Sequence, residues 1–136
     1  MKKAGIINQP IAAVISGLGH TDTITIADAG LPIPAATQRI DLALKRGIPS
    51  FLETLRVILS EMCVEKAIVA EEIKSVSPHM LDALVNMLHE TPIEFVPHAV
   101  FKQETVSAKA IIRTGEFTPY ANVILVAGAW GFDSGE

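Results

Sequence analysis

Residues 19–34 read Gly-His-Thr-Asp-Thr-Ile-Thr-Ile-Ala-Asp-Ala-Gly-Leu-Pro-Ile-Pro, and this stretch defines a strand between two turns. Threonine and isoleucine alternate over residues 23–27, which is typical of a half-buried strand, and the flanking glycines and prolines indicate turns. The strand separates His20 from Asp28. Both ionisable groups therefore lie where a rigid element meets a loop, which is where functional side chains are commonly found.

Outward from this strand, the sequence predicts alternating helices and strands with short connections. Asn8 is placed to cap a helix that has Pro10 in its first turn, and Ser50 with Glu53 has the spacing of a capping box. The expected helices cover residues 8–17, 50–62, 77–90 and about 101–112, and the expected strands cover 23–27, 66–70, 93–96 and 123–127. Such alternation favours an α/β fold with one layered domain over residues 1–136, in which helices cover a central sheet. The pattern itself leaves open a parallel or a mixed sheet, and we expect a mixed one.

The composition indicates self-association and argues against nucleic-acid binding. Hydrophobic residues make up 49% of the 136 residues, and the mean hydropathy is +0.39. This is more apolar than one small core requires, so we expect a homo-oligomer. The net charge is -4 and no basic run stands out. A protein that follows a phosphate backbone needs the opposite pattern.

The sequence also argues against export and against a membrane span. Cys63 is the single cysteine, which excludes an internal disulfide and fits a reducing compartment. The late apolar run, residues 123–130, is far shorter than the ~20 residues that a membrane helix needs. The first apolar run is interrupted by Asn8 and Pro10, unlike a signal peptide. We therefore expect a cytoplasmic protein with no membrane partner.

Common cofactor and nucleophile motifs are missing from the sequence. The chain has neither a GxGxxG loop nor a Walker pattern, no HExxH or CxxC, and no GxSxG. We therefore expect no bound cofactor and no metal. One alternative stays open, because His20, Asp28 and His98 could assemble a metal site in space.

The four histidines differ in their sequence context. His79 and His89 fall within one expected helix, where solvent-exposed positions explain them. His98 follows the strand over residues 93–97 and, like His20, lies at the boundary of an element. His20 and His98 are therefore the candidates for chemistry.

A second candidate segment precedes the last strand. Gly115 and Pro119 indicate a loop that carries Tyr120, the single tyrosine, and Asn122. A phenol and a carboxamide both donate and accept hydrogen bonds without charge, which suits a ligand rich in hydroxyl groups. The alternative is that Tyr120 packs on the core and Asn122 satisfies the backbone.

These segments resemble the D-ribose pyranase family over nearly the whole chain and in order. The stretch Asp28-Ala29-Gly30-Leu31-Pro32 is closer to the ribose branch of this family than to the related fucose mutarotases. The segments that carry the resemblance are GHTDTITIADAGLPIP from Gly19, RIDLAL from Arg39, GIPSF from Gly47, AEEI from Ala70, His98 with Phe101-Lys102, and RTGEFTPYAN from Arg113.

The resemblance implies an isomerase that interconverts the pyranose and furanose forms of β-D-ribose for ribose utilisation, without a metal or cofactor. It implies ring-shaped homo-oligomers built from pentamers, including stacked decamers, with sites at subunit boundaries. The chain departs from the family after the last strand, at residues 130–136, which leaves the ring size open. The site residues that it implies are His20 as the catalytic acid, and Asp28, His98, Tyr120, Ala121 and Asn122 as sugar contacts.

The chemistry of such an exchange is proton transfer to the ring oxygen and from the anomeric hydroxyl. Histidine, with an ordinary pKa near ~6.5, serves both directions near neutral pH. Asp28 either orients His20 or binds a sugar hydroxyl. Three other functions remain open from sequence: a non-catalytic ribose-binding accessory protein of ribose uptake, a fucose-type mutarotase, and a phosphocarrier that uses His20.

Overall fold

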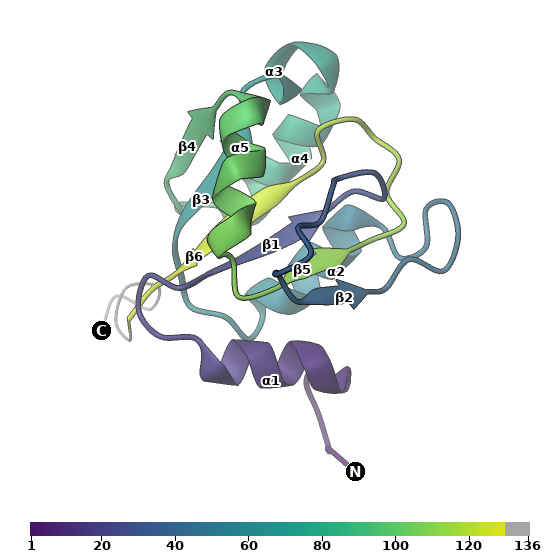
Figure 1. The fold of residues 1–136 in the computed structure, drawn as a ribbon, viewed down its shortest axis with the longest axis vertical. Helices are drawn as coiled ribbons and strands as arrows, with labels where there is room; N and C mark the ends of the chain where they lie inside the picture. The colour runs from purple at the N-terminus through teal and green to yellow at the C-terminus, as the bar shows by residue number, and fades with distance from the viewer. Residues whose placement is uncertain (130–136) are drawn as a thin grey trace.

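The protein forms one six-stranded sheet with helices on both faces (Figure 1). This is a computed structural model, and it describes residues 1–129. Residues 130–136, including the tail that departs from the family pattern, lie outside the described residues. The strands are β1 (Thr23–Ala27), β2 (Arg39–Asp41), β3 (Val64–Ala70), β4 (Ile93–Val96), β5 (Ile111–Arg113) and β6 (Val123–Ala127).

The sheet is mixed, as expected, because β6 runs against both of its neighbours. The strand order is β2-β5-β1-β6-β3-β4. The pairs β2–β5, β5–β1 and β3–β4 are parallel, whereas β6 pairs with β1 and β3 in the antiparallel sense. The carboxyl ends of the other strands and the beginning of β6 therefore lie at one edge of the sheet.

Side chains alternate between two cores, one on each face of the sheet. In β1, Ile24 and Ile26 belong to the larger core, which α2 and α4 cover, and Ala27 belongs to the smaller one. Phe101 of α5 fills the smaller core and is fully buried. Figure 1 shows α5 alone across the front of the sheet, with α1 beyond its lower edge. The helices are α1 (Gln9–Gly17), α2 (Phe51–Leu59), α3 (Ile73–Val76), α4 (Pro78–Leu88) and α5 (His98–Glu104).

The predicted helix starts at Asn8 and Ser50 are confirmed by their capping bonds. The Asn8 side chain accepts a hydrogen bond from the Ile11 N–H at 3.1 Å, and Ser50 Oγ accepts one from the Glu53 N–H at 3.1 Å. Each bond satisfies a helix N–H that has no partner within its own helix. Among residues 1–129, no helix combines the length and the apolar composition needed to cross a membrane.

The predicted polar helix over residues 101–112 is wrong. The helix α5 begins earlier, at His98, and ends at Glu104, and a 3-10 turn (Thr105–Ser107) follows it. The chain then enters β5, where the adjacent Ile111 and Ile112 are both buried, one in each core. Two consecutive buried residues suit a central strand, whose side chains point to opposite faces. The short strand β2 was also not predicted.

Candidate functional site

The topology of the sheet brings five of the six predicted site residues to one edge, namely Asp28, His98, Tyr120, Ala121 and Asn122. Asp28 follows β1, His98 follows β4, and Asn122 precedes β6. Because β6 is antiparallel to β1, with Ile26 opposite Val123, Asn122 lies next to the end of β1. Ligands of open α/β sheets bind outside the carboxyl ends of the strands. This carboxyl edge is therefore the candidate sugar site.

Asp28 and Asn122 are joined by two hydrogen bonds across the edge. The Asp28 backbone N–H donates to Asn122 Oδ1 at 2.8 Å, and Asn122 Nδ2 donates to Asp28 Oδ2 at 3.2 Å. Asn122 is 1% exposed, whereas Asp28 is half-buried. Burial raises the pKa of the Asp28 carboxyl above its usual value, although hydrogen bonds from Gly30 and Asn122 lower it in part. The carboxylate is thus held in place with one side toward solvent.

His98 and Tyr120 stand beside this pair. Their rings meet edge to face, with centroids 5.0 Å apart. The Nδ1 atom of His98 is buried and has no hydrogen-bond partner among residues 1–129. This leaves Nε2 as the ring nitrogen able to bond a ligand. Tyr120 is half-buried and adopts a positive φ of 62°. A non-glycine residue in this region is uncommon and is often found at functional sites.

Ala121 is fully buried, and its backbone N–H donates to the Thr118 carbonyl oxygen at 3.3 Å. Its methyl group packs in the larger core. Any contact that Ala121 makes with a sugar therefore involves its backbone.

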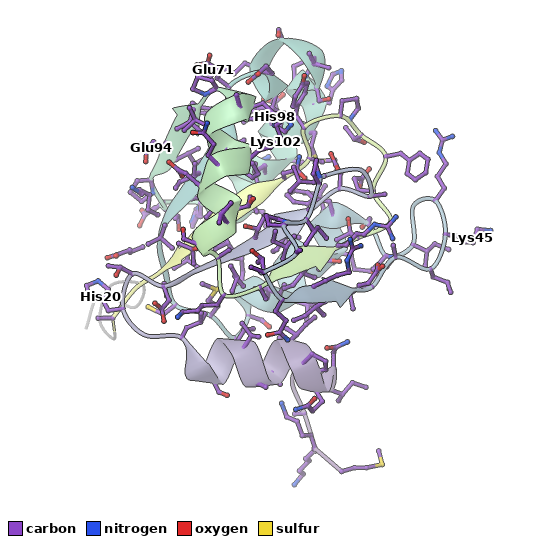
Figure 2. All side chains as sticks on the ribbon, in the orientation of Figure 1. His20, Lys45, Glu71, Glu94, His98 and Lys102 are labelled. Carbon is purple, nitrogen blue, oxygen red and sulfur yellow. The ribbon has the colours of Figure 1, made fainter. Side chains whose placement is uncertain are left out.

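His20 lies at the opposite edge of the sheet. It precedes β1, and the five residues of that strand alone span about 16 Å. Figure 2 shows His20 far from His98, which stands at the start of α5. The structure therefore does not bring His20 together with Asp28 in one chain. Among residues 1–129, the carboxylate of Glu65 lies beside His20, with Oε1 3.1 Å from His20 Nε2. The hypothesis that Asp28 orients His20 is wrong within one chain.

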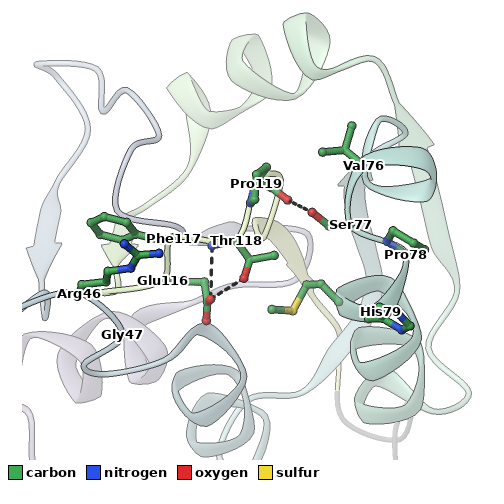
Figure 3. Close-up of a pocket in the computed structure, with 11 residues that line it drawn as sticks. Arg46, Gly47, Val76, Ser77, Pro78, His79, Glu116, Phe117, Thr118 and Pro119 are labelled. Atoms are coloured by element: carbon green, nitrogen blue, oxygen red, sulfur yellow. Dashed lines mark hydrogen bonds between the residues drawn. The ribbon is translucent and has the colours of Figure 1, made fainter.

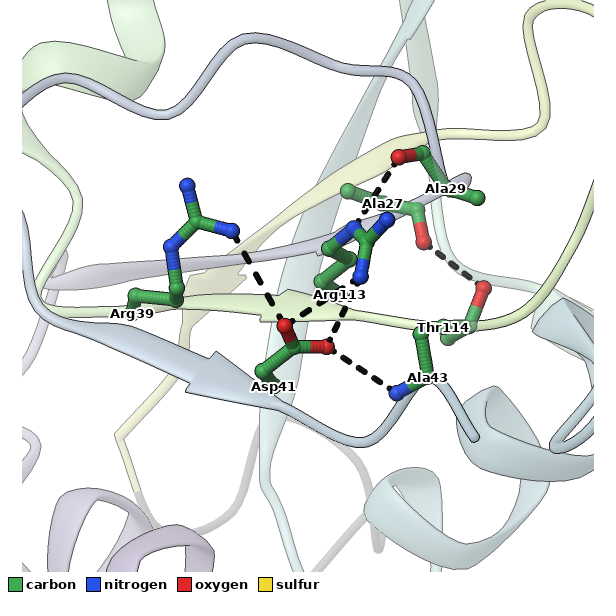
Figure 4. Close-up of polar contacts among 7 residues, drawn as sticks. All are labelled: Ala27, Ala29, Arg39, Asp41, Ala43, Arg113 and Thr114. Carbon is green, nitrogen blue, oxygen red and sulfur yellow. Dashed lines mark hydrogen bonds and ion pairs between the residues drawn. The ribbon is translucent and has the colours of Figure 1, made fainter. Parts of the chain in front are cut away.

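Arg113 stabilises the turn that follows Asp28 through hydrogen bonds (Figure 4). Arg113 Nε donates to the Ala29 carbonyl oxygen at 3.0 Å. Its Nη1 contacts both carboxylate oxygens of Asp41 at 3.2 Å, and Arg39 lies 3.9 Å from Asp41. The strands β5 and β2 thereby hold the backbone next to Asp28.

A cavity of about 530 Å³ lies between the start of α4 and the loop before Tyr120 (Figure 3). His79 is exposed, as predicted for it and for His89, and lines this cavity. Glu116 accepts hydrogen bonds from the Phe51 N–H at 3.0 Å and the Thr118 hydroxyl at 2.8 Å. Burial raises the pKa of Glu116, but these hydrogen bonds outweigh it, and the pKa lies below its usual value. The carboxylate is thus engaged in holding the loop.

Sequence reasoning missed three residues that support the site: Glu65, Glu72 and Arg113. Both carboxylate oxygens of Glu72 accept the His98 backbone N–H, at 3.0 and 3.1 Å, which fixes the start of α5. Glu72 is the second residue after β3, and Asp28 directly follows β1, so acidic residues that come just after a strand are the signal that could have found it. Within residues 1–129, no three His, Cys, Asp or Glu side chains are grouped as a metal ion requires.

Comparison with known proteins agrees with this fold. The chain is 56% identical to the D-ribose pyranase of Laribacter hongkongensis over 128 residues, which cover 94% of this chain and 98% of that protein. It is 54% identical to the D-ribose pyranase of Bacillus cytotoxicus, with the same coverage. Among solved structures, Bacillus subtilis RbsD complexed with D-ribose matches with a TM-score of 0.92 and 53% identity, over 95% of this chain and 98% of that one.

The fucose mutarotase of Streptococcus pneumoniae, solved in complex with L-fucose, shares the fold. It matches with a TM-score of 0.81 and 24% identity, over 95% of this chain and 99% of that one. The model of the RbsD / FucU transport protein family matches residues 1–130. With the mixed sheet and the polar carboxyl edge, these matches establish that the chain belongs to the RbsD / FucU transport protein family.

Proposed function

We propose that this protein is an isomerase that interconverts β-D-ribopyranose and β-D-ribofuranose by acid/base ring opening and reclosure. The observation that carries the proposal is the cluster of Asp28, His98, Tyr120 and Asn122 at the carboxyl edge of the sheet. These side chains supply hydrogen-bond donors and acceptors with a single carboxylate, which suits a neutral ligand rich in hydroxyl groups.

Similarity to named proteins supports ribose as the substrate. A relative called D-ribose pyranase is 56% identical, and a structure complexed with D-ribose is 53% identical. The fucose mutarotase is 24% identical, and that likeness concerns the fold alone. We place the reaction in ribose utilisation in the cytoplasm, which agrees with a single cysteine in the chain.

The reaction needs two proton transfers in ring opening and two more in reclosure. In ring opening, the anomeric hydroxyl loses its proton, the C1–O5 bond breaks, and O5 gains a proton, which yields the open-chain aldehyde. In reclosure, O4 attacks C1 and loses its proton, and the aldehyde oxygen gains one. The net composition of the sugar is unchanged. We assign His20 as the acid that exchanges these protons, and the carboxyl-edge residues as the groups that hold the sugar.

Because His20 lies at the other end of β1, we infer that a neighbouring copy supplies it. One chain does not bring His20 and Asp28 to the same sugar, since β1 separates them. A head-to-tail contact between copies would place the His20 turn of one against the carboxyl edge of the next. The site is then complete only at a subunit boundary.

Exposed apolar side chains support such an assembly. Leu44 is 78% exposed and Phe117 55% exposed, and Ile48 near them is 49% exposed. The guanidinium carbon of Arg46 lies 4.9 Å from the centroid of the Phe117 ring, so a charged group borders these apolar side chains. Patches of this kind mark protein contacts. We propose a homo-oligomeric ring of five subunits, either alone or as two rings stacked into a decamer.

Magnetisation-exchange NMR on ribose tests the activity. We expect the protein to accelerate pyranose–furanose exchange, and His20→Ala to lower the enzymatic rate by about 100- to 10,000-fold. The controls His79→Ala and His89→Ala remove exposed imidazoles elsewhere and should exchange ribose at the parent rate. Ribose binding without faster exchange by the parent would identify a non-catalytic accessory protein instead.

Subunit complementation tests the shared site. His20→Ala and Asp28→Ala chains, each inactive alone, are unfolded, mixed in equal amounts and refolded together. In a shared site, about one boundary in four joins an intact His20 to an intact Asp28, and this fraction of activity returns. If no activity returns although mixed oligomers form, both groups act within one chain.

A further inference from the structure

The turn that carries His20 is tightly fixed to the sheet. The Gly19 N–H donates to Asp22 Oδ2 at 2.8 Å, and the Thr21 N–H donates to the Ala127 carbonyl oxygen at 2.9 Å. Thr21 adopts a φ of 71°, which is rare for a β-branched residue. Such a conformation is unfavourable and persists only where the surrounding structure imposes it. The fold thus holds the residue next to His20 in an unfavourable conformation.

A β-bulge directs Glu65 toward this turn. In the pairing of β3 with β6, Val64 lies opposite Ala127 and Lys66 lies opposite Val126. Two steps along β3 therefore correspond to one step along β6, and Glu65 is the extra residue. Bulges of this kind re-aim a side chain and are frequent beside active sites.

Glu65 meets His20 with both of its carboxylate oxygens. Oε1 lies 3.1 Å and Oε2 lies 3.2 Å from His20 Nε2. The Glu65 side chain is 20% exposed, and that of His20 is 50% exposed. The carboxylate is thus the more enclosed partner, and the imidazole keeps a face toward solvent.

We propose that Glu65 is a positioning residue for the proposed ribose isomerisation, on which this inference rests. Its carboxylate accepts a hydrogen bond from the Nε2–H group of His20. This bond fixes the ring orientation and the tautomer, so that Nδ1 exchanges protons with the sugar. The hydrogen bond made by one ring nitrogen of a histidine decides which of the two nitrogens carries the proton. A carboxylate also stabilises the imidazolium that forms when Nδ1 takes a proton, as in other carboxylate–imidazole pairs.

The other charged groups around the turn have their own partners. Asp22 accepts the Gly19 N–H. Glu61 and Lys2 line the same cavity as His20, and both bond the backbone of Ile6. Lys66 pairs with Glu94 at 2.9 Å. Glu65 is therefore the carboxylate that the described structure places against His20.

Steady-state ribose exchange separates positioning from a structural role. We expect Glu65→Ala to lower kcat about tenfold, less than His20→Ala, and to leave KM unchanged, because ribose is held at the other edge of the sheet. Glu65→Gln keeps an acceptor for Nε2 but loses the charge, so its kcat should lie between Ala and the parent. The matched control Glu94→Gln removes an exposed carboxylate that pairs with Lys66 and should exchange ribose at the parent rate.

The ¹⁵N chemical shifts of the His20 ring supply a readout independent of activity. In the parent we expect one protonated and one unprotonated ring nitrogen, and in Glu65→Ala the averaged shifts of two tautomers. Identical ring shifts in the two proteins would overturn the proposal, as would a loss that appears in KM or in the oligomer mass rather than in kcat. If the parent does not accelerate ribose exchange, the proposed function fails, and the ring shifts still decide whether Glu65 fixes His20.

Discussion

Truncation of Asn122 to alanine tests the central bond pair of the carboxyl edge. Asn122 is 1% exposed, and its amide makes both hydrogen bonds to Asp28, at 2.8 and 3.2 Å. The substitution leaves the Asp28 N–H without its partner, which costs about 1–3 kcal/mol, and it removes a second bond worth ~1 kcal/mol. We expect the free energy of unfolding to fall by about 2–4 kcal/mol.

Ribose binding should weaken in the same variant. The bond from Asn122 Nδ2 to Asp28 Oδ2 holds the carboxylate that we propose as a sugar contact. The Asn122 amide is itself a proposed sugar contact. Losing one such interaction corresponds to about tenfold in affinity or more. Urea unfolding at fixed protein concentration gives the stability, and titration calorimetry gives the ribose affinity.

Asn8→Ala is the matched control. It removes the side-chain cap of α1, which is not among the assigned sugar contacts, and should cost ~1 kcal/mol of stability at parent ribose affinity. The reasoning is refuted if Asn122→Ala unfolds at the same urea concentration as the parent. It is equally refuted if its ribose affinity is no lower than that of Asn8→Ala.

Other substitutions test the ligand contacts, the ionisation of the carboxylates and the assembly. Tyr120→Phe should weaken ribose binding by roughly 5- to 150-fold; normal binding with a lower melting temperature would make the phenol a structural anchor. Burial raises the pKa of Asp28, so its stabilising contribution is present below the usual value of 3.8 and is lost as pH rises through the folded pKa. The stability advantage of the parent over Asp28→Asn should therefore shrink with rising pH in urea unfolding. For Glu116 the pH dependence of stability has the opposite sign. Burial raises its pKa, but hydrogen bonds lower it overall. The stability advantage of the parent over Glu116→Gln is therefore present above pH 4.5 and shrinks as pH falls through the folded pKa. Light scattering should give the parent a mass well above 14.6 kDa, and Leu44→Ser with Phe117→Ser should reduce it; a monomeric parent would contradict the assembly.

The elements with a strong periodic pattern could be predicted from sequence. The strands β1, β4 and β6 have the predicted bounds. Alternation indicates β1, and a short continuous apolar run indicates the buried β6. The end of α5 at Glu104 and the strand β5 at residues 111–113 could not be predicted. A three-residue strand such as β5 is too short to show a period, and its buried position in the sheet depends on partners far away in the chain.

The cluster at the carboxyl edge was more accessible to sequence reasoning than the surroundings of His20. Asp28, His98 and Asn122 each adjoin the end of a predicted strand, and a sheet brings such positions together. The contact between His20 and Glu65 depends on a bulge in β3. A bulge shifts the register by one residue, which no local pattern in residues 64–70 indicates. The separation of His20 from Asp28 follows from the length of β1. It shows that the two residues belong to opposite edges only once the strand order of the sheet is known.

The opposite placement of His20 and the carboxyl edge has a consequence for stoichiometry. Each chain would serve two sugars, one with its His20 turn and one with its Asp28 edge. In a head-to-tail row of copies, the first and last subunits each keep half of a site unmatched, whereas closure into a ring pairs every half with its complement. The number of working sites then equals the number of subunits. Each break in the ring, for instance on dilution, removes one site while every polypeptide stays folded.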